Sequence, residues 1–139
     1  KAYPDWFVNL VGAISKVLPS FQINNSLDLS NLSRDPEVLR AYKADPLVGP
    51  AISLAMAVGL IRGGKWAVAN ASQLRVPTLI LLGGGDHLVS PSPIHQFVAN
   101  ADPQIVTFEE FPGLYHELHN EPEKEMIFEK MIACLDSRL

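Results

Sequence analysis

The chain has little of several features that would classify it at once. It contains a single cysteine, Cys134, among 139 residues, which excludes an intrachain disulfide framework and a zinc site built from several cysteines. Eleven Lys and Arg against fifteen Asp and Glu give a formal net charge of −4. Because binding to phosphates needs a basic surface, nucleic-acid binding is not expected. The cysteine usage fits a reducing compartment, and we expect a cytoplasmic or peripheral membrane location.

The sequence also lacks an apolar run long enough to cross a bilayer. The longest strongly apolar stretch, AISLAMAVGLI at 51–61, has eleven residues, whereas a membrane-spanning helix needs about 20. No signal peptide is recognisable. With 47% hydrophobic and 19% charged residues, the composition is that of a folded globular domain.

Patterns in the first half predict helices. Apolar residues in the stretch 4–18 recur at helical spacing, whereas 19–34 has no sustained period and predicts a loop. Asp35 and Pro36 predict the cap and first turn of a short helix that ends before Pro46. A longer helix is predicted from about 52 to 70, with a break or kink at its glycines, Gly59, Gly63 and Gly64. No strand is expected in the first 70 residues.

The second half alternates strand and helix patterns. VPTLILL at 76–82 is a continuous apolar run, typical of a strand buried on both faces of a parallel sheet. SPSPIHQFVANA predicts a helix, QIVTFEEF at 104–111 a second strand, and the stretch 120–139 a last helix with the apolar stripe Ile127, Met131 and Leu135. This order predicts a βαβ unit followed by a helix.

The start of that last helix also carries a recognisable pattern. Asn120 followed by Glu123 resembles a capping box, in which both side chains bond to free amides of the first turn. Glu117 and Glu121 are expected to interact with the dipole at the same helix end.

Two candidate catalytic groups follow the two predicted strands. Asp86 comes after the first strand and three glycines, which allow a tight turn there. His116 lies in the loop after the second strand. Because the carboxyl ends of parallel strands meet at one edge of a sheet, we expect the Asp86 carboxylate within hydrogen-bonding distance of His116 Nδ1. Such a pair is the acid–base half of a serine-hydrolase triad, and acid before histidine is the α/β-hydrolase order.

Each candidate has an alternative. The alternative for Asp86 is that it simply caps the turn that follows it. His119 competes with His116, but it lies closer to the predicted helix start, where it would support the loop or line the rim of a site. A metal site among His87, His95, His116 and His119 is not expected, because no two histidines share a helix face at metal-ligand spacing. No cofactor is expected.

Three stretches resemble the monoacylglycerol lipase and lysophospholipase group of α/β-hydrolases: RDPEVLRAYKADPLV, VPTLILLGGGDHLVSP and FPGLYHELHNEPE. The resemblance implies an α/β fold, namely the C-terminal portion of an α/β-hydrolase, with a parallel sheet and helices on both faces. Residues 1–50 would be a helical cap and 51–139 part of the core. The resemblance assigns Asp86 as triad acid and His116 as base, and their separation of 30 residues matches the family's interval.

The same resemblance implies that the cap admits an acyl chain. Trp6, Phe7, Leu10 and Val11 are the candidates to line an acyl-chain channel or to form a lip that makes peripheral contact with a membrane. The alternative is that these four side chains pack the cap onto the body of the protein.

One required element is not in the chain. The family needs a G-x-S-x-G nucleophile elbow and an oxyanion hole built around it, and no serine in the sequence lies in that motif. We therefore expect part of a serine hydrolase of carboxylic esters, with monoacylglycerol or lysophospholipid substrates, that is inactive alone. Its expected partner is the missing N-terminal half, or a second copy paired through the sheet edge. The alternative hypothesis is a non-catalytic half-hydrolase that acts as a protein interaction module.

Overall fold

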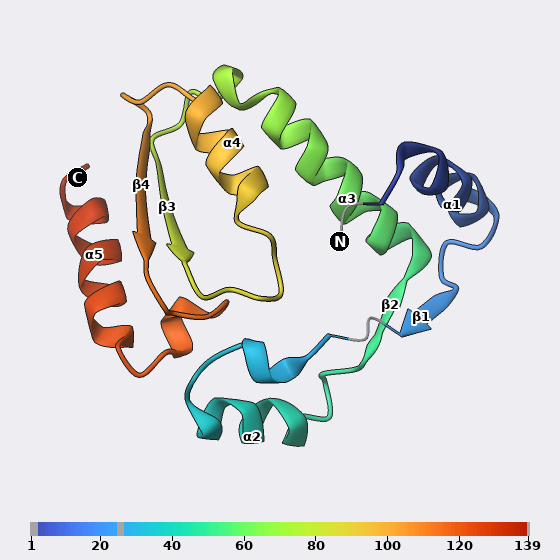
Figure 1. Ribbon diagram of the computed structural model, residues 1–139, viewed down its shortest axis with the longest axis horizontal. Helices are drawn as coiled ribbons and strands as arrows, with labels where there is room; N and C mark the ends of the chain where they lie inside the picture. Colours follow the sequence, from blue (N-terminus) through green and yellow to red (C-terminus); the bar gives the residue numbers. More distant parts are fainter. Residues whose placement is uncertain (1–2, 25–26, 139) are drawn as a thin grey trace.

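The computed structural model describes residues 3–24 and 27–138, and Figure 1 shows their arrangement. The elements are α1 (Asp5–Val17), β1 (Gln22–Asn24), α2 (Pro36–Ala44), β2 (Ala51–Ser53), α3 (Leu54–Ala69), β3 (Thr78–Gly83), α4 (Ser92–Asn100), β4 (Val106–Phe111) and α5 (Lys124–Asp136). Short 3-10 turns lie at Leu29–Asn31, Ala71–Gln73 and Leu118–Asn120. None of the helices in these described ranges is both long and apolar enough to span a membrane.

The parallel sheet of β3 and β4 organises the second half of the chain. The strands pair from Thr78 opposite Val106 to Gly83 opposite Phe111. Helix α5 covers one face and α4 the other (Figure 1). On the α5 side, Leu81 packs against a cluster of Phe111, Leu114, Leu118 and Ile127. On the α4 side, Ile80 packs against a cluster of Ala71, Ala101 and Val106. The predicted βαβ unit and the α/β class are confirmed.

The sequence predicted no strand in the first 70 residues, and this prediction is wrong. Strands β1 and β2 pair in antiparallel fashion, with Gln22 opposite Ser53 and Asn24 opposite Ala51. Each strand has three residues and β1 is exposed throughout, so neither carries the alternation or apolar run that marks a strand in sequence. Their hydrogen bonds cross the predicted boundary at residue 50, and the cap-and-core division stays a prediction.

Helix α3 contradicts the predicted break. It runs unbroken through Gly59, Gly63 and Gly64, and a β-carbon built at any of the three meets nothing within 4 Å. A glycine weakens a helix by about 1 kcal/mol relative to alanine, and α3 stays continuous while it packs against α1 and α4. The start of α3 is also secured, because Ser53 Oγ accepts a hydrogen bond from the Met56 amide at 3.2 Å.

The caps predicted for α2 and α5 have different outcomes. In α2, the Asp35 carboxylate accepts from the Glu37 amide at 2.9 Å, as predicted. In α5, the predicted capping box is wrong. The helix begins at Lys124, and Asn120 lies in the preceding 3-10 turn, where its carbonyl oxygen accepts from Ser33 Oγ at 2.7 Å. The residues that resembled a cap are instead used in contacts with another part of the chain.

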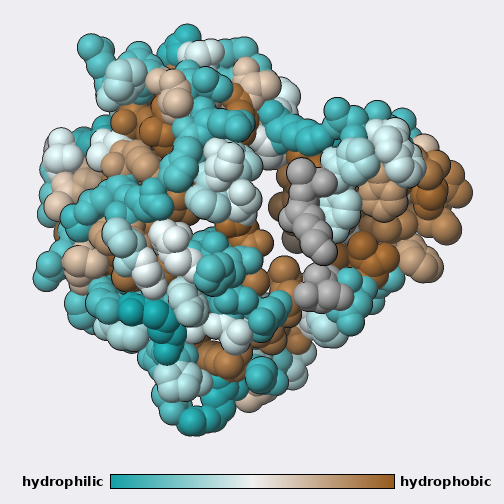
Figure 2. All heavy atoms as spheres, in the orientation of Figure 1, coloured by the Kyte–Doolittle hydropathy of each residue, from teal (hydrophilic) through white to brown (hydrophobic). Residues whose placement is uncertain are grey.

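The described chain exposes more surface than a compact protein of its size. Its accessible area is 9501 Å² for 15.2 kDa, whereas about 7,100 Å² is expected for a folded monomer of that mass. Much of the excess is apolar, on the outward faces of α1, α3 and α5, with Trp6, Val17, Leu60, Trp66, Ile132 and Leu135 all more than half exposed. In Figure 2, apolar atoms gather over the lobe that carries α1, and open space separates part of this lobe from the body with the sheet.

We expect the isolated 139-residue chain to be ordered only when another surface completes its sheet. Ordering a chain takes roughly 1–2 kcal/mol per residue of backbone entropy, and buried apolar area stabilises by about 25 cal/mol per Å², so a large exposed apolar area leaves little net stability. Pairing should occur at 76–82 and 104–111. Analytical ultracentrifugation and thermal melting at micromolar concentration test this. A cooperatively melting monomer would contradict the expectation.

Candidate active site

Asp86 and His116 form a hydrogen-bonded pair at the carboxyl edge of the sheet. The His116 Nδ1 atom lies 2.7 Å from Asp86 Oδ2, which is the atom pair that the sequence predicted. The Asp86 side chain is 4% exposed, whereas that of His116 is 38% exposed, so the carboxylate lies behind the ring. When Nδ1 donates to the carboxylate, Nε2 carries the lone pair and is the nitrogen able to accept a proton.

The second oxygen of Asp86 serves the turn that follows. Oδ1 accepts from the amides of Leu88 at 2.7 Å and Val89 at 3.0 Å. Asp86 therefore caps the turn with one oxygen and contacts His116 with the other, and its role as a triad acid stays a prediction. Burial acts to raise the pKa of Asp86, but the hydrogen bonds from His116 and from the two amides outweigh it and hold the pKa below its ordinary value. The carboxylate is thus ionised at neutral pH and can stabilise an imidazolium. Its contribution to stability is present above the ordinary pKa and is lost as pH falls through the lowered one.

Backbone contacts between two loops bring the pair together. The Gly84 amide donates to the Phe111 carbonyl and the Gly85 amide to the Leu114 carbonyl, both at 2.8 Å. The pairing of β3 with β4 therefore continues past the strand ends. A β-carbon at Gly83 would lie 2.1 Å from the Tyr115 carbonyl oxygen.

The reason for the three glycines thus differs from the predicted one. We expected them to allow a tight turn, but their φ angles are not positive; in the described chain the positive φ, 81°, is at Gly113 in the other loop. Glycine is needed at 83 because the two backbones approach too closely for a side chain.

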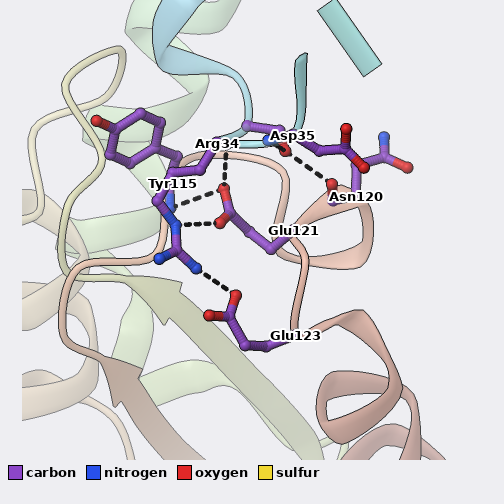
Figure 3. Close-up of polar contacts among 7 residues, drawn as sticks. Arg34, Asp35, Tyr115, Asn120, Glu121 and Glu123 are labelled. Carbon is purple, nitrogen blue, oxygen red and sulfur yellow. Dashed lines mark hydrogen bonds and ion pairs between the residues drawn. The ribbon is translucent and has the colours of Figure 1, made fainter. Parts of the chain in front are cut away.

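An ion pair between the partly exposed Arg34 and the buried Glu121 contacts the loop of His116 (Figure 3). Glu121 is fully buried, and its Oε1 accepts from the amides of Arg34 at 3.0 Å and Tyr115 at 3.2 Å. Its Oε2 accepts from Arg34 Nε at 2.6 Å, and the same guanidinium pairs with Glu123. Hydrogen bonds to Glu123 and Glu121 raise the pKa of Arg34, and the guanidinium lowers the pKa of Glu123.

Sequence reasoning missed this ion pair. It placed Glu121 near the N-terminus of the last helix, where an acid needs no other explanation, and 87 residues separate Arg34 from its partner. The available signal was that RDPE and HNEPE both lie in the stretches on which the family resemblance depends.

An apolar hollow of about 490 Å³ opens beside His116, between β3 and α5. His119 lines it too, which agrees with its predicted place at a rim and not against Asp86. The walls include Leu79 and Leu81 of β3 and the predicted stripe of α5, namely Ile127, Met131 and Leu135. Ile127 is buried, but Met131 and Leu135 are 43% and 63% exposed. The stripe of α5 is therefore only partly covered in this chain.

The other two histidines make separate contacts. His95 Nε2 lies 2.9 Å from Glu110 Oε2, and the His87 ring stands edge-on to that of Tyr115 at 6.2 Å between centroids. Within the described ranges, no group of three or more His, Cys, Asp or Glu side chains could hold a metal ion.

The four candidate substrate residues all lie on α1. This helix packs through its buried residues Val8 and Gly12, with the Arg62 guanidinium of α3 close against Gly12. Trp6, Phe7 and Leu10 are 68%, 38% and 52% exposed and Val11 is half-buried. Helix α1 and the loop between β4 and α5 lie on opposite sides of Figure 1, so these side chains and His116 are not neighbours.

Comparisons with known proteins agree on one group. The family model described as serine aminopeptidase, S33 matches residues 1–123. The chain is 33% identical over 133 residues to a monoacylglycerol lipase of Mycolicibacterium smegmatis, covering 95% of this chain and 47% of that protein. It is 30% identical over 113 residues to a putative monoglyceride lipase of Schizosaccharomyces pombe, covering 81% and 30%.

A solved structure is similar as well. The crystal structure of Paleococcus ferrophilus monoacylglycerol lipase matches with a TM-score of 0.90 and 28% identity, covering 99% of this chain and 54% of that one. The chain thus spans about half the length, or less, of the relatives that it matches.

Substituting Gly83 should separate the two loops. We expect Gly83→Ala to lower the free energy of unfolding by about 3 kcal/mol or more, because a β-carbon there overlaps the Tyr115 carbonyl. Gly63→Ala on α3 is the matched control. It meets open space and should be neutral or stabilising by up to about 1 kcal/mol. Urea unfolding of the complete protein that contains this chain measures both. Equal effects of the two substitutions would contradict the close-approach argument.

Proposed function

Because the chain belongs to the serine aminopeptidase S33 family, we propose that it is the part of a serine hydrolase that carries the triad acid, Asp86, and the triad base, His116. The 2.7 Å contact between His116 Nδ1 and Asp86 Oδ2 carries this proposal. In the reaction, His116 Nε2 takes the proton from a serine hydroxyl as the serine attacks the ester carbonyl. Asp86 stabilises the resulting imidazolium, which then protonates the leaving alcohol.

The serine comes, in this proposal, from a preceding part of the same protein, placed on the outer edge of β3. The chain has no G-x-S-x-G motif, and it covers 47% of the M. smegmatis lipase. The hollow beside His116 is lined by Pro77, Leu79 and Leu81 on the β3 side. Its apolar walls suit packing by further elements of the protein, and His116 lines the same hollow.

The substrates are carboxylic esters of single-chain lipids, monoacylglycerols or lysophospholipids. Two observations favour them. Two of the relatives named above are monoacylglycerol lipases, and the third is a putative monoglyceride lipase. In addition, Trp6, Phe7 and Leu10 of α1 present apolar surface that is exposed in this chain. These residues, with Val11, would line the acyl-chain channel or form a membrane-facing lip.

A second candidate function is a non-catalytic interaction module, formed by pairing with another protein or a second copy. The observation that favours it is the excess exposed area together with the unpaired outer edges of the described β3–β4 sheet. The transcript upstream of Lys1 separates the two functions. An in-frame G-x-S-x-G elbow supports the hydrolase, whereas a start codon without such an elbow supports the module.

The 139-residue chain by itself should hydrolyse no short-chain nitrophenyl ester faster than free imidazole does, because it has a base without a nucleophile. The complete protein should turn over monoacylglycerol and should be labelled by a fluorophosphonate, which needs an activated serine. Saturable, fluorophosphonate-sensitive turnover by the isolated chain would contradict the proposal. So would a complete protein that the reagent does not label.

In the complete protein, Asp86→Asn should lower kcat about 10⁴-fold. The amide can still accept from the Leu88 and Val89 amides, but it presents an N–H₂ group to His116 Nδ1 and so favours the wrong tautomer. His95→Ala is the matched control, since His95 also contacts a carboxylate, Glu110, at 2.9 Å. Steady-state kinetics on monoacylglycerol should show this control within about twofold of the wild type. Similar losses from both substitutions would refute the assignment.

A further inference from the structure

Glu121 is an acid that the reaction does not use, yet it is fully buried. An ionised carboxylate is unfavourable inside a protein unless it is paired and fully hydrogen-bonded. Both oxygens of Glu121 accept hydrogen bonds, Oε1 from two backbone amides and Oε2 from Arg34 Nε. A chain that merely needed a packed interior could place an apolar side chain here, so the arrangement points to a requirement for orientation.

One of those amides belongs to a peptide unit that is close to both candidate catalytic residues along the backbone. The Tyr115 amide belongs to the peptide unit that joins Leu114 to Tyr115. The N–H of this unit donates to Glu121 Oε1 at 3.2 Å, and its carbonyl accepts from the Gly85 amide at 2.8 Å. Tyr115 precedes His116 and Gly85 precedes Asp86. Fixing this one peptide therefore fixes the backbone next to both members of the pair.

Through Glu121, Arg34 connects the same peptide to the predicted cap segment, in which Arg34 itself lies. The Arg34 amide and guanidinium both bond to Glu121 (Figure 3). Neighbouring contacts run in parallel: the Glu117 amide donates to the Leu32 carbonyl at 2.8 Å, and Ser33 Oγ donates to the Asn120 carbonyl at 2.7 Å. Arg34 is thus the counter-ion of the buried Glu121 carboxylate, and it shares its guanidinium with the more exposed Glu123.

We infer that Glu121, with Arg34 as its counter-ion, is a positioning residue that holds His116 Nδ1 against Asp86. The kinetic consequence rests on the proposed function, whereas the structural consequence does not. Loss of Glu121 frees the peptide between Leu114 and Tyr115, and the imidazole ring then samples orientations in which Nδ1 no longer faces the carboxylate.

The test uses the complete protein that contains this chain, with three variants. Glu121→Ala removes all contacts of the carboxylate. Glu121→Gln keeps an oxygen for the two amides but turns an N–H₂ group toward Arg34 Nε, so donor faces donor. Adding Arg34→Met to Glu121→Gln removes that conflict and leaves the oxygen in place. The matched control is Glu109→Gln, because Glu109 pairs with Lys130 at 2.7 Å on the sheet face toward α5, and so its ion pair does not involve the His116 loop.

Two measurements are made on each variant that melts cooperatively above the assay temperature. Nitrogen-15 shifts of the His116 ring report which ring nitrogen carries the proton. Kinetics on monoacylglycerol separate kcat from KM. We expect Glu121→Ala to lower kcat about 10- to 100-fold with little change in KM, and to convert the Nδ1–H tautomer into a mixture. Glu121→Gln should lie between Glu121→Ala and the wild type, the double variant should recover toward the wild type, and Glu109→Gln should change neither measurement.

The inference is overturned if a folded Glu121 variant melts at lower temperature but keeps the wild-type tautomer, since Glu121 would then only stabilise the fold. If Glu121→Ala does not fold, the comparison of Glu121→Gln with the double variant decides, and failure of the second substitution to restore the tautomer counts against the inference. The ring measurement needs no substrate. A complete protein without esterase activity would therefore refute the proposed function and still leave the positioning role decided by the tautomer.

Discussion

The site depends on parallel strand pairing that continues beyond the strands themselves. Between β3 and β4 the ladder ends at Gly83 and Phe111, but the amides of Gly84 and Gly85 go on bonding to the opposite loop. Without those two hydrogen bonds the loops would be free to separate, and the Asp86–His116 contact would have to hold a mobile backbone. A side chain at Gly83 would prevent the approach. The small residues before the acid are thus a geometric requirement of the pair.

Sequence reasoning reached this pair because the relevant signals are local. A continuous apolar run marks a strand buried on both faces, and the chemistry of parallel sheets lies beyond the carboxyl ends of strands. One such run at 76–82 and a second strand pattern at 104–111, each followed by a loop with a candidate residue, were enough to predict that Asp86 and His116 lie close together. The β3–α4–β4–α5 order followed from the same patterns, and the acid-before-histidine order then narrowed the chemistry to one class of hydrolase.

The features that the sequence did not reveal depend on contacts between distant residues. In the sequence, Glu121 looks like an ordinary acid at a helix start. In the structure it is buried and paired with Arg34, which lies 87 residues earlier. Strands β1 and β2 are too short to carry a period, and they form because 22–24 and 51–53 meet. The glycines of α3 suggest a kink when the helix is considered alone, yet the helix is continuous where it packs against α1 and α4.

These distant contacts explain why half a fold can still place an acid and a base. The Asp86–His116 pair depends on β3, on β4 and on the hydrogen bonds that Ser33 and Arg34 make to Asn120 and Glu121. All of these lie in this chain. The surfaces that the chain leaves exposed are not of this polar type. The hollow beside His116 and the exposed part of the α5 stripe are apolar, and the outer edge of β3 is an unpaired strand edge in the described chain. Asp86 and His116, the candidate proton-transfer groups, are therefore held by polar contacts internal to the chain, whereas the open surfaces are suited to hydrophobic packing and strand addition. A nucleophile brought by such packing would meet a base whose orientation is already set, which is the pre-organisation that general-base catalysis requires.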